Sequence, residues 1–588
     1  MKKNARFMKK MLAVGLSSLC LSTAVFGAGC GPIGTNDGLG GNGGNGGGGN
    51  SNITIDNTKA QLYVANLQGG IGGEWLEKVI ARFENAYKDV SFDNGKTVGV
   101  QIIPNYEYGT NGAYLLLPTD TYDVYFNESL TYNAYVMQNQ LLDLSDVVNA
   151  PAKTGPETSE SKTIASKMNQ DRKDALTAYN GKYYAIPHYE AYRGVSYNVD
   201  VFADNFLYFA KNQNNGNNGF VVSKTDAKSS GPNGKSGDYD DGLPATIEEF
   251  LKLCEKMAGM GITPFVWPGE STAYCEYLVD AIAASIGGAE AAALPYAYDS
   301  NGKQVEVITG FSGGAPTKTK MVINNDNGYY VKQLAGKYYG YQVLEQIIDK
   351  IDSYAYRLSN NDTSFTQYDS QEEFIRSALK NQPIGMIIDG NYWWNEAKPA
   401  YQRSINSYGD RAKNRNFAWM PMPTAINESD RASGAKEPVL TDVMKSYAFV
   451  NANIAEDASK VKLAKEFVSF CYSDESLREF TTTTGVAKGL NYELLPTEEA
   501  ALDSFAKSCW TMRKKATIVP TLSKNRLVIE NEMVLTHYMH ETVVSGDAYN
   551  TPFRGFLDGI TAAEYFQGQW VSKNKWTSEY GRYFTEGV

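Results

Sequence analysis

The pattern that decides the fold lies in residues 122–148, which read YDVYFNESLTYNAYVMQNQLLDLSDVV. It begins with a short predicted strand, YDVYF, and continues after a polar break as a helix at 130–140. The same alternation precedes it, where predicted strands at 61–66 and 98–103 flank a helix at 75–87. Strands that alternate with helices predict an α/β lobe with a mostly parallel sheet. Such a sheet binds ligands beyond the carboxyl ends of its strands.

The alternation of strand and helix continues after residue 148. Thr246 is a typical N-cap for a helix that ends near Met260, and two glutamates follow it in the first turn. A buried strand is predicted at 384–389 and a further helix at 457–472. Asp299–Gly302 predicts a hairpin turn between two strands.

The length of the chain sets the number of lobes. It has 588 residues, whereas a single hydrophobic core stops growing near about 250–300 residues. We therefore expect at least two lobes. A polar stretch at 212–241, rich in Gly, Asn, Ser and Lys, is typical of an exposed insertion.

Composition excludes several classes of protein. The net charge of -11 and the pI near 5.1 argue against a nucleic-acid partner, which needs clustered Lys and Arg. The sequence contains no G-x-x-x-x-G-K-[ST] or G-x-S-x-G motif, so it does not support ATP hydrolysis or lipase-type chemistry. The 40 tyrosines suit both packing and contact with sugars.

No cofactor and no metal is expected. His537 and His540 have H-x-x-H spacing, but further ligands are not evident near them. Residues 238–242, DYDDG, lack the spacing and the bidentate glutamate of a calcium loop. The cysteines of the body have no C-x-x-C spacing and are expected to be buried free thiols: Cys254, Cys275, Cys471 and Cys509.

The first thirty residues predict export. A basic segment with three lysines and an arginine among its first nine residues precedes a short apolar run at 11–26. The sequence Phe26-Gly-Ala-Gly-Cys30 then resembles a bacterial lipobox, although Gly27 stands where Leu is usual. Residues 1–29 are therefore predicted to be a lipoprotein signal peptide, and Cys30 the lipidated residue.

A flexible tether is predicted after Cys30. Residues 38–52 read GLGGNGGNGGGGNSN, with no apolar period. About 22 residues of this composition have a root-mean-square span of roughly 25 Å. Residues 30–52 are thus expected to hold a folded body just off the extracellular face of a membrane.

Six segments of the body resemble the maltodextrin-type extracellular solute-binding proteins of bacterial ABC importers, known as family 1. Besides residues 122–148, they read GKYYAIPHYEAYRGVSYNVDVF at 181–202, LPATIEEFLKLCEKMAGMGITPF at 243–265, IGMIIDGNYWW at 384–394, FAWMPMPTA at 417–425 and AKEFVSFCYSDES at 464–476. No single segment is specific. Their shared order carries the resemblance, over nearly all of residues 61–570.

The resemblance implies a fold class, an α/β fold of two lobes joined by a three-crossing hinge, with the ligand cleft between the lobes. The N-terminal lobe is expected to comprise residues 53–188 and 446–487. The C-terminal lobe is expected to comprise 189–445 and 488–588, with the third crossing near 484–488. It also implies an oligosaccharide as ligand, the permease subunits of an ABC importer as partner, and a monomer.

The family grips sugars with aromatic faces and planar polar side chains, since a pyranose has one apolar face and a rim of hydroxyls. The strand-end cluster Tyr392, Trp393 and Trp394 is expected to supply the main stacking ring. The other expected ligand contacts are Trp267 and Glu270 in one loop, Glu190, Tyr192 and Arg193 at the first crossing, and Trp75, Asn127 and Glu128 in the N-terminal lobe. Arg554 is a weaker candidate.

Two other functions are compatible with the sequence. The same fold can carry a peptide or a polyol. A surface-anchored glycoside hydrolase would need two carboxylates about 5–10 Å apart across a cleft, and Glu190 with Glu270 is a conceivable pair. Incubation with oligosaccharides distinguishes the hydrolase from the binding protein.

Overall fold

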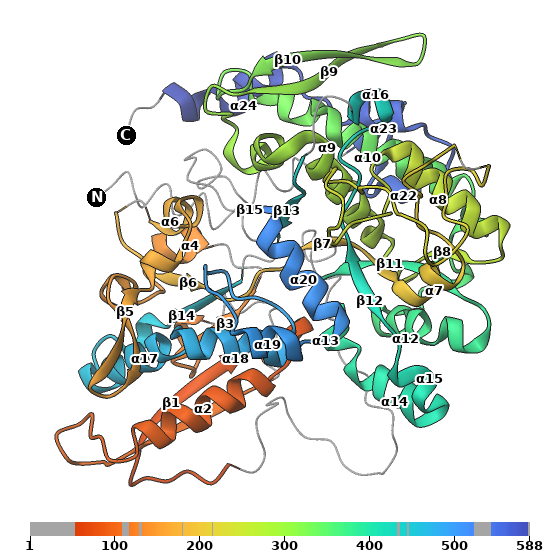
Figure 1. Cartoon of the computed structure of the whole chain (residues 1–588). Coiled ribbons are helices and arrows are strands. Elements are labelled where there is room, and N and C mark those ends of the chain that lie inside the picture. Colours follow the sequence, from red (N-terminus) through yellow and green to blue (C-terminus); the bar gives the residue numbers. More distant parts are fainter. Residues whose placement is uncertain are drawn as a thin grey trace.

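The computed structural model describes residues 53–106, 108, 117–128, 132–178, 180–214, 216–431, 436–443, 446–521 and 542–585. The predicted signal peptide, Cys30, the tether and both His537 and His540 lie outside these residues. The predicted α/β class is confirmed, because helices pack against two separate sheets of five and four strands. Figure 1 shows these sheets with the helix α20 running between them.

Lobe 1 is built around the five-stranded sheet, in the order β2-β1-β3-β14-β6. Its strands are β1 (Ala60–Asn66), β2 (Val100–Asn105), β3 (Val124–Asn127), β6 (Ala185–Pro187) and β14 (Tyr447–Val450). The three early strands pair in parallel, as predicted, whereas β14 is antiparallel to both of its neighbours. The sheet is therefore mixed, because β14 returns from a distant part of the chain.

Helices cover the sheet of lobe 1 with apolar faces. They include α2 (Glu74–Ala86), α4 (Tyr132–Met137), α6 (Gln170–Leu176), α17 (Ala458–Phe470) and α18 (Asp474–Thr484). In α2 the buried residues recur at helical spacing, from Leu76 through Val79 and Ile80 to Phe83. They join one continuous core with β1 and β3.

Lobe 2 is built around the four-stranded sheet, in the order β12-β7-β11-β8. These strands are β7 (Arg193–Asn198), β8 (Thr263–Val266), β11 (Ile384–Gly390) and β12 (Phe417–Met420). Every residue of β11 is buried, as expected for a central strand. Around the sheet lie α8 (Ile247–Gly259), α9 (Cys275–Ala297), α10 (Ala335–Ile348), α12 (Gln367–Ser377), α14 (Lys398–Tyr408) and α20 (Ser504–Lys515).

Local predictions in lobe 2 are confirmed in one case and wrong in another. Thr246 does cap α8, since its side chain accepts a hydrogen bond from the backbone of Glu249. Asp299–Gly302, however, is not a hairpin turn but the link between α9 and β9 (Gln304–Ser312). The hairpin lies later, where Gly313 and Gly314, both at positive φ, connect β9 to β10 (Ala315–Val322).

The chain passes between the lobes three times. The first crossing joins β6 to β7, and the second joins β13 (Val439–Asp442) to β14. For the third crossing, predicted near 484–488, the structure shows that residues 490–494 still pack in the core of lobe 1. The crossing is made between α19 (Pro496–Ala501) and α20, whose residues contact β12 of lobe 2.

Candidate ligand-binding site

The lobes touch directly at the end of β11. The short helix η1 (Gly69–Ile71) of lobe 1 lies so close to lobe 2 that a methyl group on Gly70 would overlap the ring of Tyr392. Asn395 strengthens this contact by donating its side-chain amide to the carbonyl of Gly70, at 2.9 Å. Tyr392 therefore stands where the two lobes meet.

Polar and aromatic side chains from four elements surround Tyr392. Tyr274 and Tyr277 come from the start of α9, and Asp389 from the end of β11. The guanidinium of Arg193, on β7, lies 4.3 Å from the ring centre of Tyr277. We call this set the cleft cluster: Arg193, Tyr274, Tyr277, Asp389, Tyr392, Glu396 and, from lobe 1, Glu128.

One amide holds two carboxylates of the cleft cluster together. The Nε2 of Gln371, on α12, donates to Asp389 at 3.1 Å and to Glu396 at 2.8 Å. Both carboxylates therefore lie within about 6 Å of each other by the reach of these two bonds. Gln371 is fully buried, and its Oε1 has no hydrogen-bond partner among the described residues.

Burial raises the pKa values of the carboxyl groups in this cluster and so favours their neutral, protonated forms. Removal from water raises the pKa of Glu128 and of Asp389 to about 7 each, and the charge of Arg193 partly opposes the rise in both. Burial and the neighbouring Asp389 raise the pKa of Glu396 to about 8. At neutral pH these carboxyl groups are therefore partly protonated, and they can donate as well as accept hydrogen bonds.

The structure brings only part of the predicted site together. Tyr392, Arg193 and Glu128 belong to the cleft cluster. Asn127 is buried beside it at the end of β3, where its side chain accepts from the backbone of Glu128 at 2.8 Å. Glu270 lies in an exposed turn, and Arg554 forms a surface ion pair with Asp558.

Four predicted tryptophans lie in hydrophobic cores. Trp393 is fully buried and donates to Ser196, and Trp394 donates to Asp503 while packing on Phe417. Trp267 lies in the core of lobe 2 and Trp75 in that of lobe 1. A short helix begins at Trp393, and both indoles pack in a hydrophobic cluster with Phe417. Ligand contact at the four tryptophans remains a prediction.

Trp75 also forms part of a cage around a buried lysine. The ammonium of Lys488 lies 4.5 Å from the Trp75 ring centre and 4.7 Å from that of Phe480. Its Nζ lies 2.9 Å from Nδ1 of His188. Burial lowers the pKa of Lys488 to about 7. This cage lies within the core of lobe 1.

Glu190 and Tyr192 form a hinge network instead of facing the cleft. The carboxylate of Glu190 is held by Arg172 at 2.8 Å and by Arg513 at 2.7 Å, and it accepts from the hydroxyl of Tyr192. Arg172 also pairs with Asp442 at 3.0 Å. Both oxygens of Glu190 are therefore paired within the protein, at the first crossing between the lobes. Its contact with a ligand remains a prediction.

Sequence reasoning missed several members of the cleft cluster. Asp389 ends the predicted strand IGMIID, at the edge where ligands bind. Tyr274 and Tyr277 stand three residues apart, so they share one face at the start of α9. The sequence therefore contained a signal for Asp389, Tyr274 and Tyr277. Gln371 and Glu396 offered none, because only the packing of α12 against the strand end brings them together.

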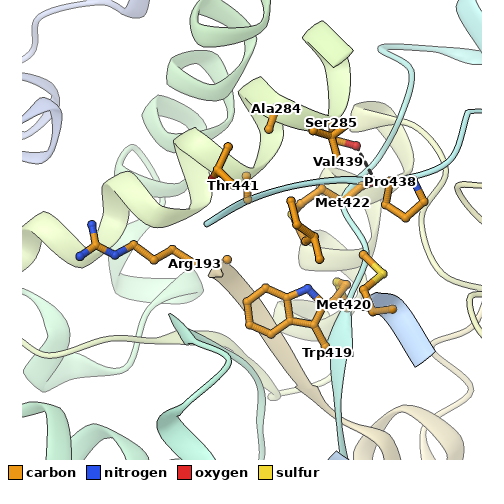
Figure 2. A pocket seen from close by; sticks show the side chains of 13 residues that line it. Arg193, Ala284, Ser285, Trp419, Met420, Met422, Pro438, Val439 and Thr441 are labelled. Atoms are coloured by element: carbon orange, nitrogen blue, oxygen red, sulfur yellow. Dashed lines mark hydrogen bonds between the residues drawn. The ribbon is translucent and has the colours of Figure 1, made fainter. Parts of the chain in front are cut away.

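A small hollow lies behind Arg193. Figure 2 shows the side chain of Arg193 extending away from Trp419 and Met420, which line it. It lies between α9 and β13, is lined by Met422 and Leu440 as well, and has room for about one water molecule. It is too small for a sugar ring.

Comparison with known proteins identifies the fold. No protein-family model and no curated protein matches the sequence. A solved chitin oligosaccharide binding protein is 12% identical and has a TM-score of 0.52, with 89% of this chain and 100% of that chain covered. The GacH receptor of Streptomyces glaucescens GLA.O (12%, TM-score 0.49, 89% and 99%) and the apo-form of RafE from Streptococcus pneumoniae (15%, 0.48, 90% and 99%) are also similar.

At these identities the likeness establishes the fold and no more. The chain has the two-lobe, periplasmic-binding-protein-like fold, and the fold predicted from the sequence segments is confirmed.

Proposed function

We propose that this protein captures an oligosaccharide between its two lobes and delivers it unchanged to the permease of an ABC importer. The observation that carries the proposal is the cleft cluster, where the ring of Tyr392 lies against Gly70 at the junction of the lobes, near the carboxyl groups of Asp389 and Glu396. A ring suits the apolar face of a sugar, and carboxylates accept hydrogen bonds from its hydroxyls. The chitin oligosaccharide binding protein of similar fold supports a carbohydrate ligand.

Binding is favoured over hydrolysis by the state of the carboxylates. Glu190 and Glu270 are poorly suited to act as a catalytic pair. Glu190 is neutralised by two arginines, whereas Glu270 is exposed. Asp389 and Glu396 share the amide of Gln371, whereas a hydrolase needs two carboxylates that flank the scissile bond.

The proposal predicts tight binding without turnover. Calorimetric titration of the purified protein with oligosaccharides of increasing length should give a dissociation constant near or below about 1 μM for at least one of them, which corresponds to about −8 kcal/mol. Chromatography should recover that sugar intact. Absence of binding and of thermal stabilisation with every glycan would refute capture, and release of shorter sugars would point to the hydrolase.

We further propose that the mature protein is a lipid-anchored monomer on the extracellular face of the membrane. The support is the lipobox-like context of Cys30 and the Gly-rich tether. Cys30→Ser should abolish acylation and move the protein from the membrane fraction to the medium or leave its leader uncut, since acyl chains anchor through about 0.8 kcal/mol for each buried methylene. Cys20→Ser, in the same leader, is the matched control and should stay membrane-bound. Unchanged fractionation and mass of the Cys30 variant would rule out the anchor.

A further inference from the structure

The cleft cluster combines three carboxyl groups with a single guanidinium, and the hydroxyls of Tyr274, Tyr277 and Tyr392 are its further donors. Its carboxylates are those of Glu128, Asp389 and Glu396, and its one guanidinium belongs to Arg193. The charge of Arg193 reaches Glu128 and Asp389. Glu396 differs, because its strongest charged neighbours are the two other carboxylates. An ammonium group placed among these three carboxyl groups would favour their ionised forms.

A buried amide oxygen adds a further acceptor. The Nε2 of Gln371 is fixed between Asp389 and Glu396, so the orientation of the amide is determined. Its Oε1 then points elsewhere and finds no donor among the described residues, although the side chain is fully buried. A buried acceptor without a partner costs free energy, and a ligand that donates to it removes that cost.

The aromatic wall of the cluster suits a cation. Tyr274, Tyr277 and Tyr392 are each more than nine-tenths buried. Tyr277 already holds the guanidinium of Arg193 at 4.3 Å from its ring centre. Aromatic faces combined with carboxylates are the usual recognition elements for an ammonium group.

We propose that the sugar captured here carries a protonated primary amine, which enters the cleft cluster beside Glu396 and Gln371. An ammonium brings three donors and no acceptor, whereas a hydroxyl brings an acceptor with its donor. The carboxyl groups in their ionised forms and the free amide oxygen therefore match an ammonium better. This inference rests on the proposed capture of an oligosaccharide and narrows the class to amino sugars.

The test compares two matched sugars by calorimetry at pH 7. Oligomers of glucosamine, with free amines, should bind at least about tenfold more tightly than N-acetylated oligomers of the same length. Glu396→Gln should remove most of this margin by weakening only the amine form, and Glu128→Gln provides a second variant if the first folds poorly. The matched control is Glu248→Gln, an exposed glutamate of α8, which should preserve the margin.

The outcomes separate this inference from the proposed function. If the N-acetylated oligomers or another neutral glycan bind equally or more tightly, the proposal that the ligand carries an amine is overturned. The proposed capture of a carbohydrate would stand. Binding of spermidine without measurable binding of any glycan would uphold the ammonium site but refute a carbohydrate ligand. If Glu396→Gln and Glu128→Gln both keep the full difference in affinity between the amine and N-acetylated oligomers, the amine does not bind at the cleft cluster.

Discussion

Replacing Arg172 by methionine is expected to lower the free energy of unfolding by about 3–5 kcal/mol, the usual cost of removing one partner from a buried ion pair. Arg172 is 5% exposed and holds both Glu190 and Asp442. Methionine would leave Asp442 without a cationic partner and Glu190 with Arg513 alone. Two buried carboxylates would then be poorly compensated at neutral pH.

The Arg172 variant is measured by urea denaturation alongside an exposed counterpart. Arg554→Met removes a surface pair with Asp558, whose side chains are 62% and 37% exposed, and should cost no more than about 1 kcal/mol. Because Glu190 and Asp442 stand at the first two crossings, the Arg172 variant should also unfold its lobes less cooperatively. An equal, small effect in both variants would show that the network does not hold the hinge.

Tyr392→Ala is expected to weaken oligosaccharide binding about 30- to 1000-fold, as the loss of a central ring contributes about 2–4 kcal/mol at a binding hot spot. Its ring lies where the lobes meet, against Gly70, and it also packs on the core of lobe 1. Its removal should therefore lower the melting temperature as well as the affinity. Calorimetry with the best glycan found for the parent protein measures the change.

Trp393→Ala is the matched comparison, one residue along the chain. Its indole is fully buried against Phe374, Phe417 and Phe505, so truncation should lower stability by about 3–5 kcal/mol while the folded fraction binds normally. The two variants are thus distinguished by their affinity. If Tyr392→Ala melts early yet binds as well as the parent, that ring is core and the proposed site is misplaced.

Local sequence patterns predicted the fold better than the site. Short-range signals, such as the cap at Thr246 or the apolar spacing in α2, depend on neighbours in the chain and were correct. The aromatic run at 392–394 directed attention to the end of β11, but the sequence could not show which ring lies against the other lobe. That depends on the helix that begins at Trp393.

The residues of the hinge also could not be identified from the sequence. Glu190 stands beside Arg193, and both looked equally suited to a ligand. Glu190 is withdrawn into the hinge because Arg172 and Arg513, which are 341 residues apart in numbering, converge on it. Arg193 instead begins β7 and lies beside Tyr277 in the cleft. Contacts between residues so far apart in the chain cannot be predicted from local spacing in the sequence.

The position of β14 has a consequence for the order in which the protein folds. This strand lies between β3 and β6, so the sheet of lobe 1 is incomplete until residue 450 is available. The sheet of lobe 2 needs only residues 193–420. Closing a long loop is slow, and a folded lobe 2 would bring the ends of that loop together. The lobe that begins the chain is therefore the later one to complete its sheet, although β1, β2 and β3 can pair with one another before β14 is made.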